Sequence, residues 1–165
     1  VGSEMCIRDS PNTKLVIVGD GPARAEVEKQ LPHAVFTGGL GGEDLPRAVA
    51  SMDVFCSTGE LETFCQAVQE AKACGLPVIS PRKGGPIDLI DPSRTGWLYE
   101  PGDMTDFRSR VVDLVGDDYK RHAMGIAARA SIENRTWENL CAELVEHYKE
   151  AIRLAGRSTR IRAVL

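Results

Sequence analysis

The chain has 165 residues, of which 42% are hydrophobic, and it carries a net charge of −4. This length and composition predict one soluble globular domain with its own core and exclude two full domains. The charge gives no indication of nucleic-acid binding, and we recognise neither a secretory signal nor an apolar stretch of the ~20 residues that span a membrane. The expected location is therefore the cytoplasm.

The first ten residues, VGSEMCIRDS, show neither helical nor strand periodicity. We predict that residues 1–13 are a foreign or disordered segment, for example a translated cloning adaptor. The folded domain is expected to span residues 14–154, and residues 155–165 are expected to form a frayed tail.

From residue 14 onward, short apolar runs alternate with segments of helical spacing. The apolar runs predict buried parallel strands at 15–18, 35–37, 54–56, 77–80 and 97–99. Helical spacing follows Pro22 and recurs at 43–51, 63–74, 87–90, 105–115, 118–132 and 136–154. The expected apolar stripe of the 63–74 helix consists of Phe64, Ala67, Val68, Ala71 and Cys74. This alternation predicts an α/β fold with a doubly wound parallel sheet, followed by C-terminal helices. Such sheets bind ligands at the carboxyl ends of their strands, which points to the loops at 19–22, 37–42, 57–64 and 81–86.

The first of these loops carries Gly19, Asp20, Gly21 and Pro22 between a strand and a helix. Such a turn lets backbone N–H groups approach an anion. As a dinucleotide fingerprint it is poor, because Arg24 stands where the third glycine of G-x-G-x-x-G belongs. A tight turn without a ligand is an equally good interpretation of this motif alone.

The third loop and its helix carry two carboxylates, Glu62 and Glu70, with the helix starting between them. Eight helical residues rise ~12 Å and complete a little over two turns, so both carboxylates lie on roughly one side. That separation is on the scale of a sugar diphosphate. Glu62 is predicted to orient a hexose and Glu70 to accept hydrogen bonds from a ribose, while the amides of residues 64–66 receive the diphosphate. The alternative is that Glu62 is an acid favoured by the helix dipole and Glu70 a solvated surface residue.

The run from 62 to 79, ETFCQAVQEAKACGLPVI, resembles the signature of the retaining GT-B glycosyltransferases, a family that includes bacterial mannosyltransferases and sucrose synthases. The resemblance covers about residues 14–152. It extends in order and spacing to VIVGDGP (16–22), VFTG (35–38), Gly84-Gly85, TGWL (95–98), PGD (101–103), and Trp137 with Tyr148.

The resemblance implies the Rossmann-like C-terminal half of a GT-B fold and a retaining hexosyltransferase that needs no metal or other cofactor. Glu62 would be the catalytic residue. The donor-binding residues would be Gly19, Thr37, Gly38, Leu40, Glu62, Thr63, Phe64, Cys65, Gln66 and Glu70.

Two departures from the family pattern qualify this expectation. Cys65 replaces the usual glycine, and with Gln66 and the run GGPIDL (84–89) it looks most like actinobacterial enzymes that transfer mannose from GDP-mannose to lipid acceptors. The resemblance also implies that this chain lacks the Arg and Lys with which the family binds the diphosphate, and the N-terminal acceptor domain. The fragment alone is therefore predicted to be inactive.

Several alternatives stay open at this stage. The donor could be a UDP-sugar, and the protein could be an epimerase of the same fold or a non-catalytic binding module. The basic loop 82–85 could contact phosphate or form a solvated turn. The acceptor is expected to be a lipid or a glycan, with peripheral membrane association of the full enzyme as one option; the tail arginines could meet anionic lipid or stay solvated.

The cysteines and histidines give no indication of a metal site. No cysteine forms a C-x-x-C pair or lies near a histidine at ligand spacing. Reduced structural thiols are the expected state of Cys6, Cys56, Cys65, Cys74 and Cys141, and the scattered histidines are His33, His122 and His147.

Overall fold

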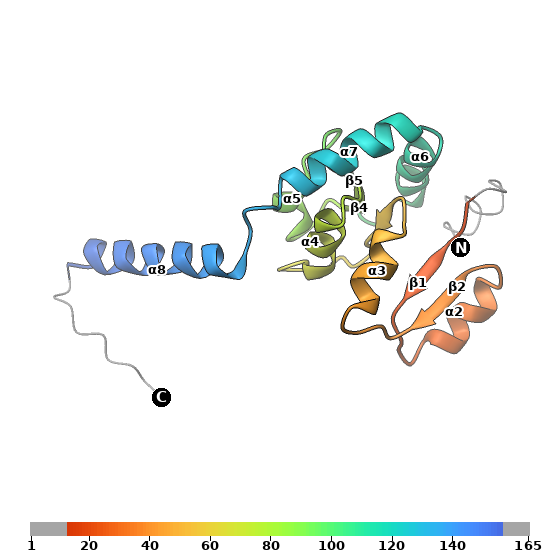
Figure 1. The fold of residues 1–165 in the computed structure, drawn as a ribbon, viewed down its shortest axis with the longest axis horizontal. Helices are drawn as coiled ribbons and strands as arrows, with labels where there is room; N and C mark the ends of the chain where they lie inside the picture. Colours follow the sequence, from red (N-terminus) through yellow and green to blue (C-terminus); the bar gives the residue numbers. More distant parts are fainter. Residues whose placement is uncertain (1–12, 157–165) are drawn as a thin grey trace. The chain divides into compact units, whose positions relative to one another are not determined.

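The computed structural model describes residues 13–156, and its chain alternates strands with helices as the sequence predicts (Figure 1). The predictions for residues 1–12 and 157–165 lie outside the described residues. The chain divides into two units, one ending at Ile132 and the other beginning at Glu133. The strands are β1 (Val16–Val18), β2 (Val35–Gly38), β3 (Phe55–Cys56), β4 (Val78–Pro81) and β5 (Gly96–Tyr99). The helices are α2 (Arg24–Gln30), α3 (Asp44–Ala50), α4 (Gln66–Ala73), α5 (Pro86–Leu89), α6 (Met104–Val115), α7 (Asp118–Ala130) and α8 (Trp137–Leu154).

All the strand pairs in the described part of the chain are parallel, which confirms the predicted α/β class. They form two ladders, one of β1 with β2 and the other in the order β3-β4-β5. The ladders are not joined by a strand pair, whereas a single continuous sheet was expected. The β1–β2 ladder contains an irregularity between Ile17 and Val18, which shifts the register before the strands end.

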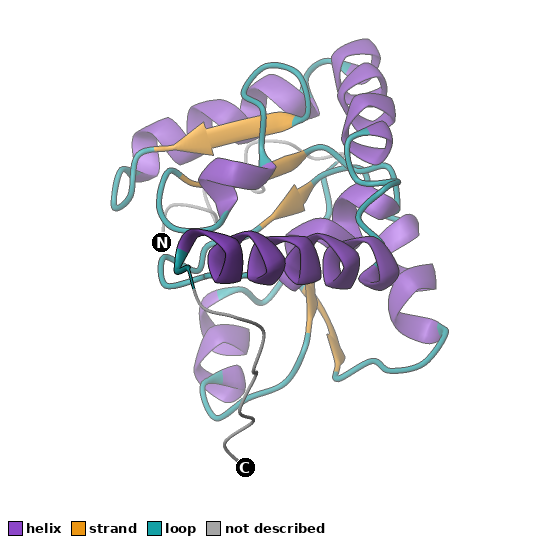
Figure 2. Ribbon diagram, turned by 90° about the vertical axis from the view of Figure 1, so that its left-hand side faces the viewer, coloured by secondary structure: helices purple, strands orange, loops and turns teal. Residues whose placement is uncertain are grey.

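The first unit is built around β4, whose residues are all buried. Neighbouring side chains of a strand point to opposite faces, so Val78 and Ile79 enter different apolar clusters. The first cluster includes Val68 and Ala71 of α4, and the second includes Phe107 and Leu114 of α6. Helices on both sides of the strands therefore bury the sheet, as Figure 2 shows. Burying one such side chain contributes about 1.5–3 kcal/mol.

In its described residues, 133–156, the second unit contains the amphipathic helix α8. Thr136 caps it, because its hydroxyl accepts a hydrogen bond of 3.2 Å from the N–H of Asn139. Ion pairs at i,i+3 spacing support its polar side, for example Arg153 with Glu150. Within residues 13–156, no helix has the length and apolar character needed to cross a membrane.

Candidate functional site

The loop after β3, at the carboxyl end of that strand, and the helix α4 that follows it together carry most of the predicted site residues. The chain leaves β3 at Cys56 and enters α4 only at Gln66. The helix was predicted from residue 63, so it begins later than expected. Cys65, directly before it, has a φ of 53° in the left-handed region and is only 3% exposed. A non-glycine residue there is strained, which explains why the family pattern has glycine at this position.

The turn at Gly84 and Gly85 packs against this loop and supports it. The Gly85 N–H donates to the Glu62 carbonyl over 2.9 Å. A Cβ atom on Gly84 would lie 2.5 Å from the carbonyl oxygen of Glu62, and one on Gly85 would lie 2.1 Å from that of Thr63. No side chain fits at either glycine, so the two loops touch backbone to backbone and hold each other in place.

The same turn carries the basic residues for which phosphate contact or solvation was left open. Lys83 pairs with Glu60 over 3.2 Å, and Arg82 pairs with Glu100 over 2.9 Å, all four side chains being largely exposed. Each cation thus already has a carboxylate partner. The supporting role of the turn resides in Gly84 and Gly85.

The two predicted carboxylates lie in different environments. Glu62 is exposed, and its side chain folds over Gly59, where an added Cβ would lie 3.1 Å from Glu62 Oε1. Glu70 is half-buried on α4, and its Oε1 accepts a hydrogen bond of 2.9 Å from Gln66 Nε2. Glu70 is therefore held by its own helix, whereas Glu62 depends on the position of its loop.

The N-terminus of α4 presents backbone donors. The first N–H of this helix region to find an α-helical acceptor is that of Gln69, which donates to the Cys65 carbonyl over 3.2 Å. The Gln69 side chain donates to the Phe64 carbonyl over 2.7 Å and closes the first turn. Cys65, the residue before the helix, provides no side-chain cap, and an anion is favoured at this positive end of the helix dipole.

One part of the helix prediction was wrong. Phe64 was expected on the apolar stripe of the helix, but it precedes α4 and is 43% exposed. Ala67 is exposed as well. Because the helix starts at Gln66, its buried face consists instead of Val68, Ala71 and Lys72.

Gly19, Thr37 and Gly38 meet at the carboxyl end of the β1–β2 ladder. The Gly19 N–H donates to the Gly38 carbonyl over 2.9 Å, and the Thr37 hydroxyl donates to the same oxygen over 3.0 Å. Leu40 follows on the next turn and is half-buried. The predicted residues thus fall into two groups, this turn and the segment around α4.

Arg24, the first residue of α2, lies beside the turn after β1; in the sequence it stood out only because it replaces the third glycine of G-x-G-x-x-G. Its guanidinium pairs with Glu28 over 2.8 Å and with Asp20 over 3.3 Å. An added Cβ on Gly38 would lie 3.3 Å from its Nη1. The hydrogen bond that Arg24 donates to Glu28 raises the pKa of Arg24, which keeps a cation at this edge. The i,i+4 spacing of Arg24 from both acids was the signal that could have revealed it.

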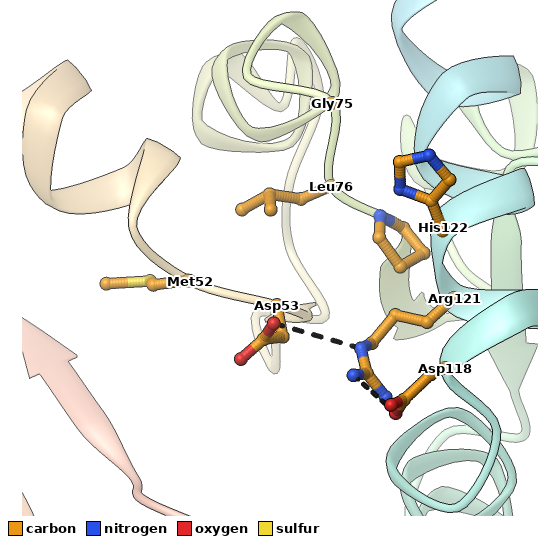
Figure 3. Close-up of a pocket in the computed structure, with 8 residues that line it drawn as sticks. Met52, Asp53, Gly75, Leu76, Asp118, Arg121 and His122 are labelled. Carbon is orange, nitrogen blue, oxygen red and sulfur yellow. Dashed lines mark hydrogen bonds and ion pairs between the residues drawn. The ribbon is translucent and has the colours of Figure 1, made fainter.

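A cavity of about 350 Å³ lies at the opposite edge, beside the amino ends of β3 and β4 (Figure 3). Arg121 projects into it and pairs with Asp118 over 2.8 Å, while Asp53 lies 3.9 Å away. The Arg121 guanidinium also donates to the Leu114 carbonyl over 2.9 Å. These contacts satisfy the cation, and the cavity contains none of the predicted site residues.

The described residues contain neither a disulfide nor a group of side chains that could hold a metal ion. Cys56, Cys65, Cys74 and Cys141 form no disulfide there. Burial, with a smaller effect of Glu62, raises the pKa of the Cys65 thiol and keeps it neutral. Within residues 13–156, no three His, Cys, Asp or Glu side chains are grouped to hold a metal ion.

Comparison with known proteins places this arrangement in context. The family model of glycosyl transferases group 1 matches residues 3–131. A GDP-mannose-dependent alpha-mannosyltransferase of Corynebacterium glutamicum is 45% identical over 144 residues, covering 87% of this chain and 35% of that protein. One from Mycobacterium tuberculosis is 52% identical over 147 residues, covering 88% and 37%. The chain therefore spans about a third of the length of these relatives.

A structural comparison supports the same fold. Sucrose-phosphate synthase from Thermosynechococcus elongatus superposes with a TM-score of 0.80 at 22% identity, covering 93% of this chain and 42% of that one. The similarity confirms the predicted Rossmann-like half of a GT-B fold.

Proposed function

Because this chain belongs to the glycosyl transferases group 1 family, we propose that it is the nucleotide-sugar-binding part of a retaining hexosyltransferase. The observation that carries this proposal is the segment from Glu62 to Glu70. It combines an exposed carboxylate on a supported loop, a helix N-terminus, and a second carboxylate held by Gln66.

Each part of the segment fits one part of a nucleotide sugar. Glu62 orients the hexose, and the amides of Phe64, Cys65 and Gln66 bind the diphosphate. Glu70 accepts hydrogen bonds from the ribose hydroxyls, which its contact with Gln66 leaves one carboxylate oxygen free to do. Gly19, Thr63 and the turn Thr37–Gly38–Leu40 complete the donor site.

Mannose from GDP-mannose is the proposed donor, and the names of the similar mannosyltransferases support this choice. In the reaction, the bond between the anomeric carbon and the diphosphate oxygen breaks. A bond to an acceptor oxygen forms on the same face of the sugar, and the proton of the acceptor hydroxyl goes to the departing diphosphate oxygen. The helix amides stabilise the negative charge of the leaving diphosphate, so this mechanism requires no metal.

Because the chain spans about a third of its relatives, we also propose that the acceptor binds mainly to a separate N-terminal domain. The acceptor would be a lipid or a glycan, and the enzyme would act in the cytoplasm or at the membrane surface. The 165 residues alone should then show no turnover.

An NMR titration of the chain tests the donor site. GDP and GDP-mannose should shift the amides of residues 64–66 and 37–40, with weak affinity. UDP is the matched comparison, and stronger binding of UDP would identify a UDP-sugar enzyme. Shifts confined to the cavity around Arg121, or no binding of either nucleotide, would contradict the proposed site.

A further inference from the structure

Lys72 occupies a position on α4 where an apolar side chain is expected. It is only 2% exposed. Lys72 follows Val68 by four residues and Ala71 by one, and these three residues form the buried face of α4. Val68 and Ala71 both belong to the apolar cluster beside β4. Burying a lysine among such residues is costly unless its ammonium group finds a hydrogen-bond partner.

The Lys72 ammonium donates to the backbone carbonyl of Leu89, which is the last residue of α5. The last carbonyls of a helix have no acceptor role within it, and they carry the negative end of the dipole. The contact is therefore a charge-assisted hydrogen bond at a position where a cation is favoured. It ties α4 to the end of α5.

From α5 the connection continues to the Glu62 loop. The helix begins with the hydrogen bonds Ile87 N–H to Gly84 and Asp88 N–H to Gly85, so α5 and the glycine turn form one short unit. The Gly85 N–H then donates to the Glu62 carbonyl over 2.9 Å. An unbroken series of contacts thus leads from Lys72 to the backbone of Glu62.

We propose that Lys72 is a positioning residue for the site: it fixes α5 and the Gly84–Gly85 turn, and thereby holds Glu62 in place. An apolar side chain at this position would pack against the same cluster but would allow α5 to shift. The polar contact selects a single position of the turn. The effect of Lys72 on catalysis rests on the function proposed above, whereas its effect on the turn does not.

Amide hydrogen exchange in the 165-residue chain tests the structural half of this proposal. Lys72→Met removes the ammonium group and keeps an apolar side chain of similar length. The Gly85 amide should then exchange about tenfold to hundredfold faster, as expected when one charge-assisted hydrogen bond no longer opposes local opening. The amides of β5 and α6 should change little.

The matched control is Leu114→Ala, which opens a cavity in the other apolar cluster. It should accelerate exchange throughout the unit without singling out Gly85. If the Gly85 amide in Lys72→Met exchanges faster only to the same extent as the other amides of the unit, Lys72 is only a core residue and the proposal is overturned. Should Lys72→Met fail to fold, the unmodified chain still decides: a protected ¹⁵Nζ resonance of Lys72 at neutral pH supports the contact, and its absence refutes it.

Turnover of a full-length enzyme with GDP-mannose tests the catalytic half. Lys72→Met should lower kcat about tenfold, because a misplaced Glu62 loosens the reactive geometry, while GDP affinity stays unchanged. Leu114→Ala, which does not touch the turn, should leave kcat unchanged at temperatures at which the variant is fully folded. Faster exchange at Gly85 together with an unchanged kcat would show that Lys72 holds the turn but that the turn does not serve catalysis.

Discussion

The turn after β1 and the loop after β3 both follow the carboxyl end of a parallel strand, but different forces hold them. Around Gly19, the contacts are a few backbone hydrogen bonds and the exposed ion pairs of Arg24. Around Glu62, the contacts are backbone-to-backbone packing on Gly84 and Gly85, a buried Cys65 and, through α5, the buried Lys72. The first turn should therefore tolerate substitution, whereas the second should not.

The difference teaches where precision is needed in the proposed site. A nucleotide can be bound by a turn that adjusts to it, since affinity accumulates from several contacts. Transfer of a sugar depends on placing one carbon atom, and small displacements are costly there. The loop of Glu62 is the better supported of the two, which agrees with its proposed role next to the hexose.

The largest expected effect comes from Gly85→Ala. Its Cβ would lie 2.1 Å from the Thr63 carbonyl oxygen and 2.8 Å from Cys65 Sγ, so the backbone must move. We expect the free energy of unfolding to fall by about 3 kcal/mol, at the upper end of what overpacking costs. Urea unfolding followed by circular dichroism measures this.

Gly21→Ala is the matched substitution in the other turn. No atom lies within 4 Å of its added Cβ, and the backbone there is not in the left-handed region. The expected change is within about 0.5 kcal/mol of zero. Equal losses for the two alanine variants would remove the distinction between the turns.

This distinction could be only partly predicted from the sequence. Apolar runs such as 15–18 and 77–80 predicted the strands, because buried parallel strands have few polar residues. The alternation of strands and helices also predicted which loops lie at the carboxyl ends of the strands. The start of α4 at Gln66 could not be predicted, because it depends on a turn some twenty residues later in the chain. That turn packs against Glu62 and Thr63.

Lys72 shows the same limit more clearly. A lysine between two alanines on a helix is normally read as a surface residue. Its burial depends on the carbonyl of Leu89, which local periodicity cannot reveal. Phe64 shows the opposite error. Its apolar character predicted burial, but the residue precedes the helix and is exposed.

The next largest effects separate the two glutamates in a full-length enzyme. Glu70→Gln should weaken binding of GDP and GDP-mannose alike, by about 1–3 kcal/mol, because a carboxylate acceptor for the ribose is lost. Glu62→Gln should leave GDP binding nearly unchanged and depress turnover. Calorimetry with GDP measures the affinity, and rate measurements with GDP-mannose measure the turnover.

Each outcome for these variants has a specific meaning. Equal GDP affinity of Glu70→Gln and the unmodified enzyme would remove the ribose role. Full turnover in Glu62→Gln would remove the sugar role and most of the argument for a transferase site here. If both variants behave like the unmodified enzyme, the two carboxylates are surface acids.

The smallest expected effect is that of Arg24→Ala at the β1–β2 turn. Both of its ion pairs are partly exposed, at 2.8 Å to Glu28 and 3.3 Å to Asp20. Such pairs contribute about 0.2–1 kcal/mol, and added salt screens them. The raised pKa of Arg24 keeps it charged at all pH values at which the protein is handled.

Arg47 on α3 provides the control, because it forms an exposed i,i+4 pair of 2.7 Å with Glu43 away from both turns. If Arg24→Ala and Arg47→Ala cost the same and lose that cost together in high salt, Arg24 acts as an ordinary surface cation in the free protein. A loss above about 2 kcal/mol for Arg24→Ala would exceed what exposed pairs supply. The position of the Arg24 guanidinium beside Gly38 would then be holding the turn, and the first region would be as precisely built as the second.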